Sequence, residues 1–244
     1  MKQIQPTTEL LQRFKSSADT LIFEGYCALT TDVVIYNQGD DYALIANVNG
    51  VRKCCFKTDS EEFVLSVLGK LSGKVELCGV DPFVTAFLKR RYDFIWETDC
   101  YLYVWNGEPL SYRCKQEIQP MSVKFAQKIS DGTHYHAAID EIEQCLTRHP
   151  SAAVYLDGEP ICWCLLHLEK SLGMLYTLPE HRHKGYALEV MTALTNMVIE
   201  RGDIPYAYIV QDNVASQNLA AKYNLVRVKN ADYFEIDLDA PLGA

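Results

Sequence analysis

The chain has 244 residues, of which 48% are hydrophobic and 23% charged, a balance typical of a protein that buries a core. Its formal net charge of −9 argues against nonspecific binding to nucleic acid or to an anionic membrane surface. No apolar stretch is long enough to span a bilayer and the first residues lack a signal-peptide core, so we expect a cytoplasmic protein without nucleic-acid or membrane partners.

The first half of the chain is predicted to be an α/β lobe over residues 1–115. Its expected elements are an amphipathic helix over 8–17, strands over 32–37, 42–47 and 51–56, a helix over 59–73, a strand over 75–80, a helix over 81–90 and two strand-like runs over 94–105. Turn-forming Asn, Asp and Gly residues separate the first three strands and indicate hairpins.

The second half is predicted to be another α/β lobe, over residues 120–244, which follows a linker near Leu110–Met121. Its expected elements are a polar helical region over 123–148, strands over 152–156, 161–168 and 172–178, a helix over 183–201, a strand over 207–210, a helix over 213–223 and strands to residue 236. The two halves therefore share one order of elements.

A degenerate internal repeat would explain this shared order. The same spacing pairs Asp81 with Asp212, Leu88 with Leu219, and Tyr92 with Tyr223. Coincidence between two ordinary α/β halves is the alternative, and the residues leave both open. If the repeat is real, its first copy carries acids at the start of the helix over 59–73, and these would repel a pyrophosphate.

Nine cysteines are present, an odd number with irregular spacing and no C-x-x-C pair. We expect reduced, mostly buried side chains, with a reactive or regulatory thiol as the alternative. The pair His134 and His136 has no third ligand at a recognisable spacing, so we expect both histidines at the surface and no metal site.

The most informative segment is a basic, glycine-containing turn between an apolar run and a helical pattern. The apolar run ends at Pro179, and the turn reads Arg182-x-x-Gly185-x-Ala187. The N-terminus of the helix that follows presents several unpaired backbone N–H groups, which suit a pyrophosphate. Glycine lets a phosphate approach the backbone, and Arg182 and Lys184 add positive charge. A plain basic helix start is the alternative interpretation.

In this context the chain resembles the GNAT superfamily of acyl-CoA-dependent N-acyltransferases, over about Ala152–Ile236. The resemblance rests on residues 176–187 and 211–225. Residues 158–163 and 177–182 are most similar to the glycine N-acyltransferase-like, FR47-type branch. The resemblance implies an α/β (α+β) GNAT fold, a mixed twisted sheet flanked by helices, with a second, degenerate GNAT-like lobe at the N-terminus.

The resemblance also implies acetyl-CoA as co-substrate. The backbone of Tyr176, Thr177 and Leu178 would pair with the acyl group and pantetheine arm. The pyrophosphate would lie on the turn that begins at His181 and continues through Arg182, His183, Lys184, Gly185, Tyr186 and Ala187. Asn213 would touch the pantetheine region, although a helix N-cap also suits this asparagine.

The implied reaction is direct attack of a primary amine, from a small molecule or amino acid, on the thioester. It needs a base, for which Glu169 stands closest to the expected position. The family branch places its glutamate about where Ser171 sits, and His167 is a further candidate base. The family's proton-donating tyrosine falls on Ala220 here, so Tyr223 is either a substitute acid or a packing residue.

Ala220 and the unsettled base motivate a rival interpretation, a non-catalytic CoA-binding or regulatory module. A homodimer assembled through the N-terminal lobe is neither supported nor excluded by the sequence.

Overall fold

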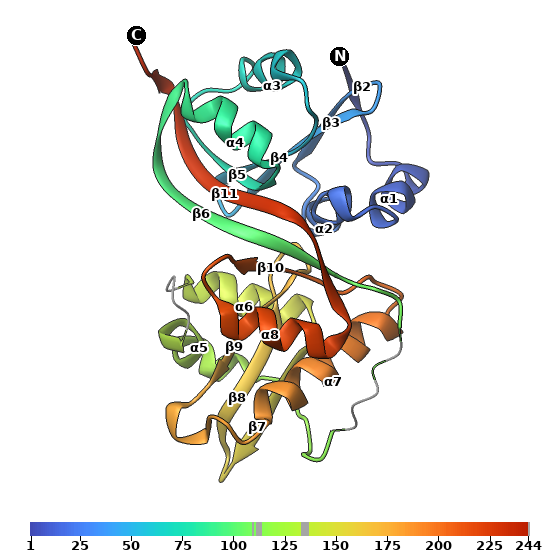
Figure 1. The fold of residues 1–244 in the computed structure, drawn as a ribbon, viewed down its shortest axis with the longest axis vertical. Coiled ribbons are helices and arrows are strands. Elements are labelled where there is room, and N and C mark those ends of the chain that lie inside the picture. The colour runs from blue at the N-terminus through green and yellow to red at the C-terminus, as the bar shows by residue number, and fades with distance from the viewer. Residues whose placement is uncertain (109, 111–113, 133–136, 244) are drawn as a thin grey trace. The chain divides into compact units, whose positions relative to one another are not determined.

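The computed structural model describes residues 1–108, 110, 114–132 and 137–243. The chain divides into two compact units (Figure 1). The N-terminal unit comprises residues 1–102, 208–212 and 228–244, and the C-terminal unit comprises residues 103–207 and 213–227. The predicted lobes, 1–115 and 120–244, are consecutive along the chain, whereas these units are interleaved.

The first ten helices and strands repeat the order expected from the sequence and add two elements to it. They are β1 (Lys2–Ile4), α1 (Thr8–Lys15), α2 (Leu21–Leu29), β2 (Val33–Gln38), β3 (Asp41–Val48), β4 (Val51–Lys57), α3 (Glu61–Leu68), β5 (Lys74–Val80), α4 (Pro82–Lys89) and β6 (Tyr92–Trp105). Strand β1 and the largely buried helix α2 are the additions. The two runs expected over 94–105 form one 14-residue strand.

The following elements repeat this order. They are α5 (Ala126–Gly132), α6 (Ile139–Arg148), β7 (Ser151–Leu156), β8 (Glu159–Leu166), β9 (Leu172–Thr177), α7 (Tyr186–Glu200), β10 (Tyr206–Val210), α8 (Val214–Ala220) and β11 (Leu225–Pro241). Each copy runs through two helices, three consecutive strands, a helix, a strand, a helix and a long last strand, so the shared order is a property of the fold.

The three residue pairs that share one spacing in the sequence agree with this repeat less well. Asp81 caps α4, but the cap of α8 is Asn213 rather than Asp212. Tyr92 begins strand β6, whereas Tyr223 lies in a short 3₁₀ turn before β11. The order of elements therefore carries the repeat, and two of the three residue pairs are not structural equivalents.

Two sheets organise the chain. The larger has eight strands in the order β1-β2-β3-β4-β5-β11-β6-β10, and the smaller has the order β7-β8-β9. The pairs β1–β2, β2–β3, β3–β4 and β5–β11 are antiparallel, whereas β4 and β5 pair in parallel through Lys53–Glu76 and Cys54–Leu77.

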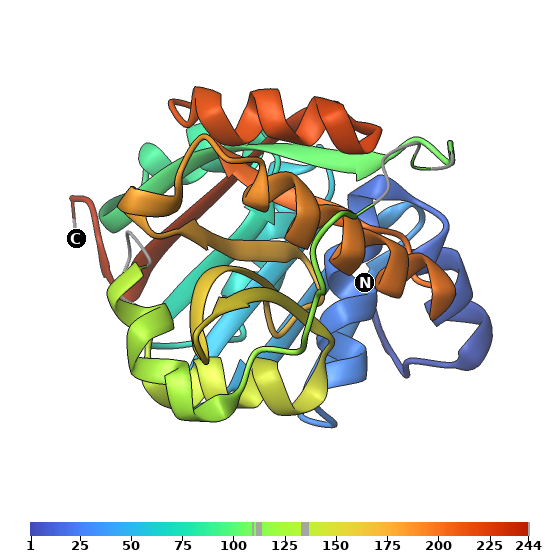
Figure 2. The ribbon, with the colours of Figure 1, turned by 90° about the horizontal axis from the view of Figure 1, so that it is seen from below.

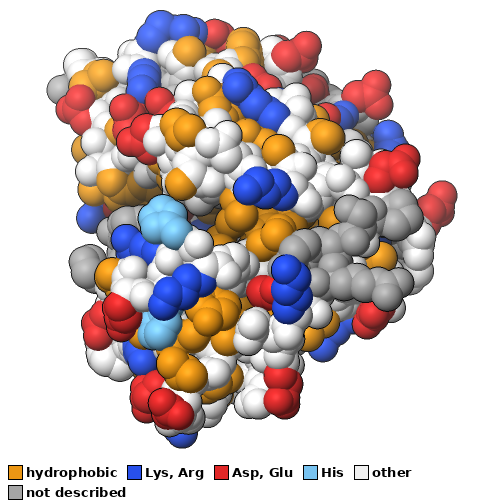
Figure 3. All heavy atoms as spheres, turned by 60° about the horizontal axis from the view of Figure 1, so that its bottom comes forward, with side chains coloured by type: hydrophobic (Ala, Val, Ile, Leu, Met, Phe, Trp, Pro, Cys, Tyr) orange, Lys and Arg blue, Asp and Glu red, His pale blue; other side chains and the backbone are white. Residues whose placement is uncertain are grey.

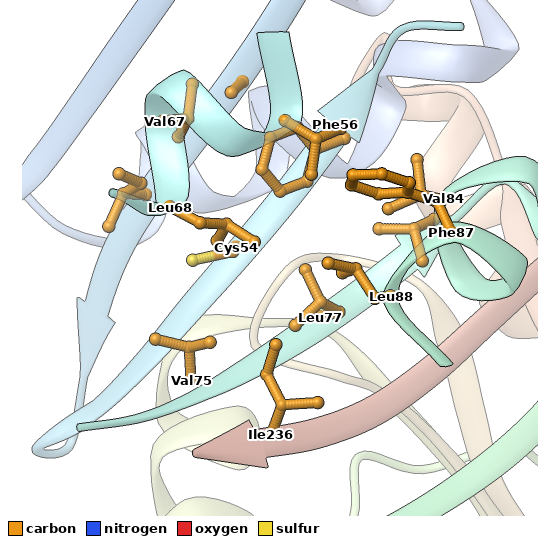
Figure 4. Packing of buried hydrophobic residues seen from close by; sticks show 14 of the residues in the cluster. Cys54, Phe56, Val67, Leu68, Val75, Leu77, Val84, Phe87, Leu88 and Ile236 are labelled. Carbon is orange, nitrogen blue, oxygen red and sulfur yellow. The ribbon is translucent and has the colours of Figure 1, made fainter. Parts of the chain in front are cut away.

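The core of the N-terminal unit lies between its sheet and the helices α3 and α4. Figure 4 shows apolar side chains from both helices directed toward strand residues, with Val67, Leu68, Val84, Phe87 and Leu88 facing Cys54, Phe56, Val75, Leu77 and Ile236. Ring stacking of Phe94 on Phe234, with centroids 4.1 Å apart, extends this core toward β6. Packing of this kind supplies most of the stability of such short helices.

In the C-terminal unit, helices cover both faces of the three-stranded sheet. Helix α7 packs on one face, and α5 and α6 pack on the other (Figures 1 and 2). The expected polar helical region over 123–148 is thus two separate helices. Within the described residues, no helix is long and apolar enough to cross a membrane.

All nine cysteines are free thiols, and most are buried. Burial raises the pKa of the Cys162 thiol to about 12, and it raises the pKa of Cys54 as well. These thiols stay protonated at neutral pH and act as small core side chains.

The two leucines of α3 give a matched test of this core. Leu68 is 3% exposed and Leu65 is 41% exposed on the same helix. Leu68→Ala should lower the free energy of unfolding by about 2–5 kcal/mol, because it leaves a cavity. Leu65→Ala, with the same change in helix propensity, should alter it by about 0.5 kcal/mol or less. Urea unfolding followed by circular dichroism measures both, and equal losses would contradict the described core.

Candidate cofactor and active site

Strand β9 has a free edge and a break in its ladder. It is the last strand of the three-stranded sheet, and among the described residues only β8 pairs with it. Between the pairs Trp163–Tyr176 and Leu165–Gly173 the register shifts, so that two residues of β9 oppose Cys164 alone. One of the two, Met174, is left-handed with φ 50°. This is a β-bulge, which leaves backbone groups unpaired beside the free edge.

The basic turn, defined here as His181–Ala187, leads from β9 into α7. His183 and Gly185 are both left-handed, with φ 62° and 89°. A Cβ at Gly185 would meet nothing within 4 Å, so glycine is needed there for its backbone conformation and not for space. Left-handed residues placed in this way turn successive N–H groups toward one side, as in anion-binding nests.

Helix α7 begins without a side-chain cap. Its N-cap residue is Gly185, which has no side chain that could cap the helix. The N–H groups at this end point out of the helix, where the positive end of the helix dipole also lies. The turn therefore combines the two features that suit a bound phosphate.

The basic side chains of the turn differ in their surroundings. The Nε of Arg182 donates to the carbonyl of Thr177 over 3.1 Å, and its guanidinium lies 5.5 Å from the centroid of the Tyr176 ring. Lys184 and His183 are exposed. Arg182, His183 and Lys184 therefore make the turn a local basic region in an acidic chain. Figure 3 shows one face of the protein, on which Lys, Arg and His side chains lie among hydrophobic ones.

The three predicted strand residues before the turn are half-buried. Tyr176 packs on Trp163 with ring centroids 5.2 Å apart, and a Cβ on Gly132 of α5 would come within 3.1 Å of Tyr176. The hydroxyl of Thr177 lies 3.1 Å from the Cys162 sulfur. The N–H of Leu178 donates to the carbonyl of Ile161 over 3.0 Å. This end of β9 is therefore rigidly packed against β8.

Asn213 precedes α8 and caps it. Its side-chain oxygen accepts from the N–H of Ser216 over 3.0 Å. The capping interpretation is thus confirmed, while the contact with pantetheine stays a prediction.

Tyr223 is a packing residue in this structure. Its side chain is fully buried, and its hydroxyl donates to the carbonyl of Ala187 over 3.1 Å. Ala220, the position of the family's tyrosine, is also buried. The bond joins the end of α8 to the start of α7 and leaves the tyrosine proton engaged.

Glu169 lies in a tight turn, His167–Ser171, which we call the glutamate turn. Its carboxylate oxygen Oε1 accepts from the Ser171 hydroxyl over 2.5 Å. The two positions between which the sequence left the base ambiguous are therefore in direct contact. The His167 ring lies against Gly173, where an added Cβ would come 2.1 Å from its Nε2. His167 is thereby packed beside the bulged strand.

Two contacts near the candidate site were not foreseen from the sequence. Tyr206, at the start of β10, donates its hydroxyl to the carbonyl of Glu169. Buried Glu189, in the first turn of α7, accepts from the N–H of Lys115 over 2.7 Å, and its carbonyl accepts from Cys114. The expected linker is thus bound to the helix that follows the basic turn. The only sequence signal for Glu189 was an acid among apolar helix residues.

No group of three His, Cys, Asp or Glu side chains is arranged to hold a metal ion among the described residues. His134 and His136 lie outside those residues.

The corresponding turn of the N-terminal copy has the opposite character. Ser60 caps α3 by accepting from the N–H of Phe63 over 3.1 Å, and Glu61 and Glu62 follow. A pocket of about 310 Å³ beside this turn is lined by Asp19, Asp40, Asp41, Phe56, Lys57, Thr58, Asp59, Asp81 and Lys229. Its carboxylates outnumber its ammonium groups, which disfavours a pyrophosphate.

The cap at Asn213 can be separated from any other role of this residue. Asn213→Ala should lower the free energy of unfolding by about 1 kcal/mol, because the N–H of Ser216 loses its acceptor. Asn213→Ser keeps a capping oxygen and should restore most of this loss. Thermal unfolding of both variants measures the effect, and equal stability of the alanine variant and the wild type would contradict the capping role.

Comparisons with known proteins agree with this geometry. Residues 156–230 match the family model described as FR47-like protein. This range contains strand β9, the basic turn, α7 and α8.

Solved structures extend the likeness over most of the chain. A Drosophila protein has a TM-score of 0.71 at 16% identity, covering 96% of this chain and 91% of its own. A putative GNAT-family acetyltransferase from Novosphingobium aromaticivorans has a TM-score of 0.57 at 13% identity, covering 83% and 90%. A GCN5-related N-acetyltransferase from Kribbella flavida has a TM-score of 0.57 at 11% identity, covering 90% and 93%.

The predicted fold class is confirmed, including the second, degenerate lobe at the N-terminus. The chain has the fold of the GNAT acetyltransferases, and its residues 156–230 match the FR47-like family model.

Proposed function

We propose that the chain is an acyl-CoA-dependent N-acyltransferase that transfers the acetyl group of acetyl-CoA to a primary amine of a small molecule or amino acid. The observation that carries this proposal is the uncapped start of α7, preceded by left-handed His183 and Gly185. These backbone N–H groups would bind the pyrophosphate, with Lys184 supplying charge.

The free edge of β9 supports the placement of the rest of the co-substrate. The pantetheine amides would pair with the backbone of β9 near Tyr176 and Thr177. The bulge at Met174 supplies unpaired backbone groups closer to the start of the same strand. An N–H group there would stabilise the negative charge that develops on the thioester oxygen during attack.

The chemistry would proceed by direct attack. Glu169 would accept a proton from the attacking ammonium, and the neutral amine nitrogen would then form a bond to the thioester carbon. The carbon–sulfur bond would then break, and the CoA thiolate would leave and take up the further proton that the nitrogen loses as the amide forms. Because the Tyr223 hydroxyl already donates to Ala187, we do not assign it this last protonation. The acidic chain modestly favours a cationic acceptor.

A pair of glycine substitutions tests the pyrophosphate site. Gly185→Glu should weaken acetyl-CoA binding at least tenfold, because it places a carboxylate and a strained residue in the turn. Gly50→Glu is the matched control, since Gly50 also has a left-handed backbone, φ 80°, and open space around it, in a hairpin of the N-terminal unit. Calorimetric titration should show wild-type affinity for the control. Equal binding by wild type and Gly185→Glu, or no binding by the wild type, would contradict the assignment.

A non-catalytic CoA-binding or regulatory module is the second candidate. Buried Ala220 and the engaged Tyr223 hydroxyl favour it, because neither offers a free proton to the departing thiolate. Release of free thiol from acetyl-CoA, measured with glycine, small amino acids and polyamines, separates the two. Binding without turnover across this panel would favour the module.

A further inference from the structure

The glutamate turn is fastened to its surroundings at three consecutive residues. The carbonyl of Leu168 lies 3.1 Å from the Nε2 of His149, and the carbonyl of Glu169 accepts from the hydroxyl of Tyr206. Lys170 places its Nζ 3.8 Å from a carboxylate oxygen of Asp203. These contacts join the turn between β8 and β9 to three other segments of the C-terminal unit.

The turn is also closed internally. The N–H of His167 donates to the carbonyl of Ser171 over 2.8 Å, and the N–H of Lys170 donates to the carbonyl of His167 over 2.9 Å. Lys170 has a left-handed backbone with φ 73°, an uncommon conformation for a lysine. The backbone on both sides of Glu169 therefore has one defined path.

The carboxylate itself is held by the side chain of Ser171. Ser171 is only 2% exposed, so its hydroxyl has little freedom, and it donates to Oε1 of Glu169 over 2.5 Å. Glu169 remains half-buried and Ser171 directly precedes β9. The carboxylate is thus oriented relative to the strand that carries the bulge.

The anchor from Tyr206 has a topological consequence. Strands β9 and β10 are consecutive in the chain and are joined by α7. They belong to different sheets and share no ladder. The contact from Tyr206 to Glu169 joins the starts of the two strands, while their other ends lead to the basic turn and to Asn213.

We propose that Ser171 and Tyr206 are positioning residues that hold the Glu169 carboxylate as the proton acceptor for the incoming amine. This inference rests on the proposed function. Ser171 fixes the direction of the carboxylate and Tyr206 fixes the backbone that carries it. A base gains most of its effect from correct placement, which the surrounding residues must supply.

A kinetic double-mutant cycle tests the proposal, using the fastest acceptor among glycine, small amino acids and polyamines. Glu169→Gln should lower kcat about 10²-fold. Ser171→Ala should lower kcat about tenfold without changing the KM for acetyl-CoA, Ser171→Thr should restore it, and Tyr206→Phe should behave like Ser171→Ala. In the Glu169→Gln background, Ser171→Ala and Tyr206→Phe should have no further effect, because each acts through the carboxylate.

Two control variants make the same substitutions elsewhere in the C-terminal unit, one at a buried serine and one at a hydrogen-bonded tyrosine. Ser151→Ala removes the acceptor for Met121, and Tyr155→Phe removes a donor to Pro120. Both should keep wild-type kcat.

Several results would overturn the proposal. If Ser171→Ala lowered kcat equally in the wild type and in Glu169→Gln, its effect would be structural alone. If Glu169→Gln kept the wild-type kcat, Glu169 would not be the base, although acyl transfer itself would stand. Absence of turnover by the wild type with every amine, despite acetyl-CoA binding, would overturn this inference together with the proposed function.

Discussion

The site depends on a helix that begins without a cap. The first N–H groups of any helix need acceptors, and most helices obtain them from a Ser, Thr, Asp or Asn side chain. Helix α7 instead follows left-handed His183 and Gly185 and leaves these groups to solvent or a ligand. The rest of the C-terminal unit keeps this end in place: α7 packs on the three-stranded sheet, and Tyr223 bonds the carbonyl of Ala187.

The two copies of the fold differ at the features on which the proposed CoA site depends. In the N-terminal copy, Ser60 caps the equivalent helix by accepting from the N–H of Phe63, and acids surround its start. Its strands β4 and β5 also pair in parallel, through Lys53–Glu76 and Cys54–Leu77. In the C-terminal copy, the equivalent strands β9 and β10 lie in different sheets. In the first copy the helix start is capped and the two strands pair with each other. In the second copy the helix start is uncapped and the two strands do not share a sheet.

The sequence predicted the order of elements and the basic turn well, because hydrophobic periodicity and glycine placement are local signals. It missed α2, whose residues are apolar on most sides and give no amphipathic pattern. It also placed the start of α7 at His183, three residues early, because the left-handed residues of the turn resemble a helix start in composition.

Contacts between distant residues could not be predicted. The interleaving of the units follows from the long strands β6 and β11, whose partners periodicity does not identify. Likewise, nothing in the order of residues 167–171 indicates that Ser171 holds Glu169 or that Tyr206, 37 residues farther on, bonds its carbonyl. The folded turn places positions 169 and 171 in direct contact, while the identity of the base stays a prediction.

Amide hydrogen exchange with and without saturating CoA would test the central claim most directly. The account predicts that the backbone N–H groups of residues 183–187 become protected when CoA is bound, while those of residues 59–63, in the N-terminal copy, do not change. Unchanged exchange at 183–187, or protection at 59–63, would contradict the assignment of the pyrophosphate to the uncapped start of α7.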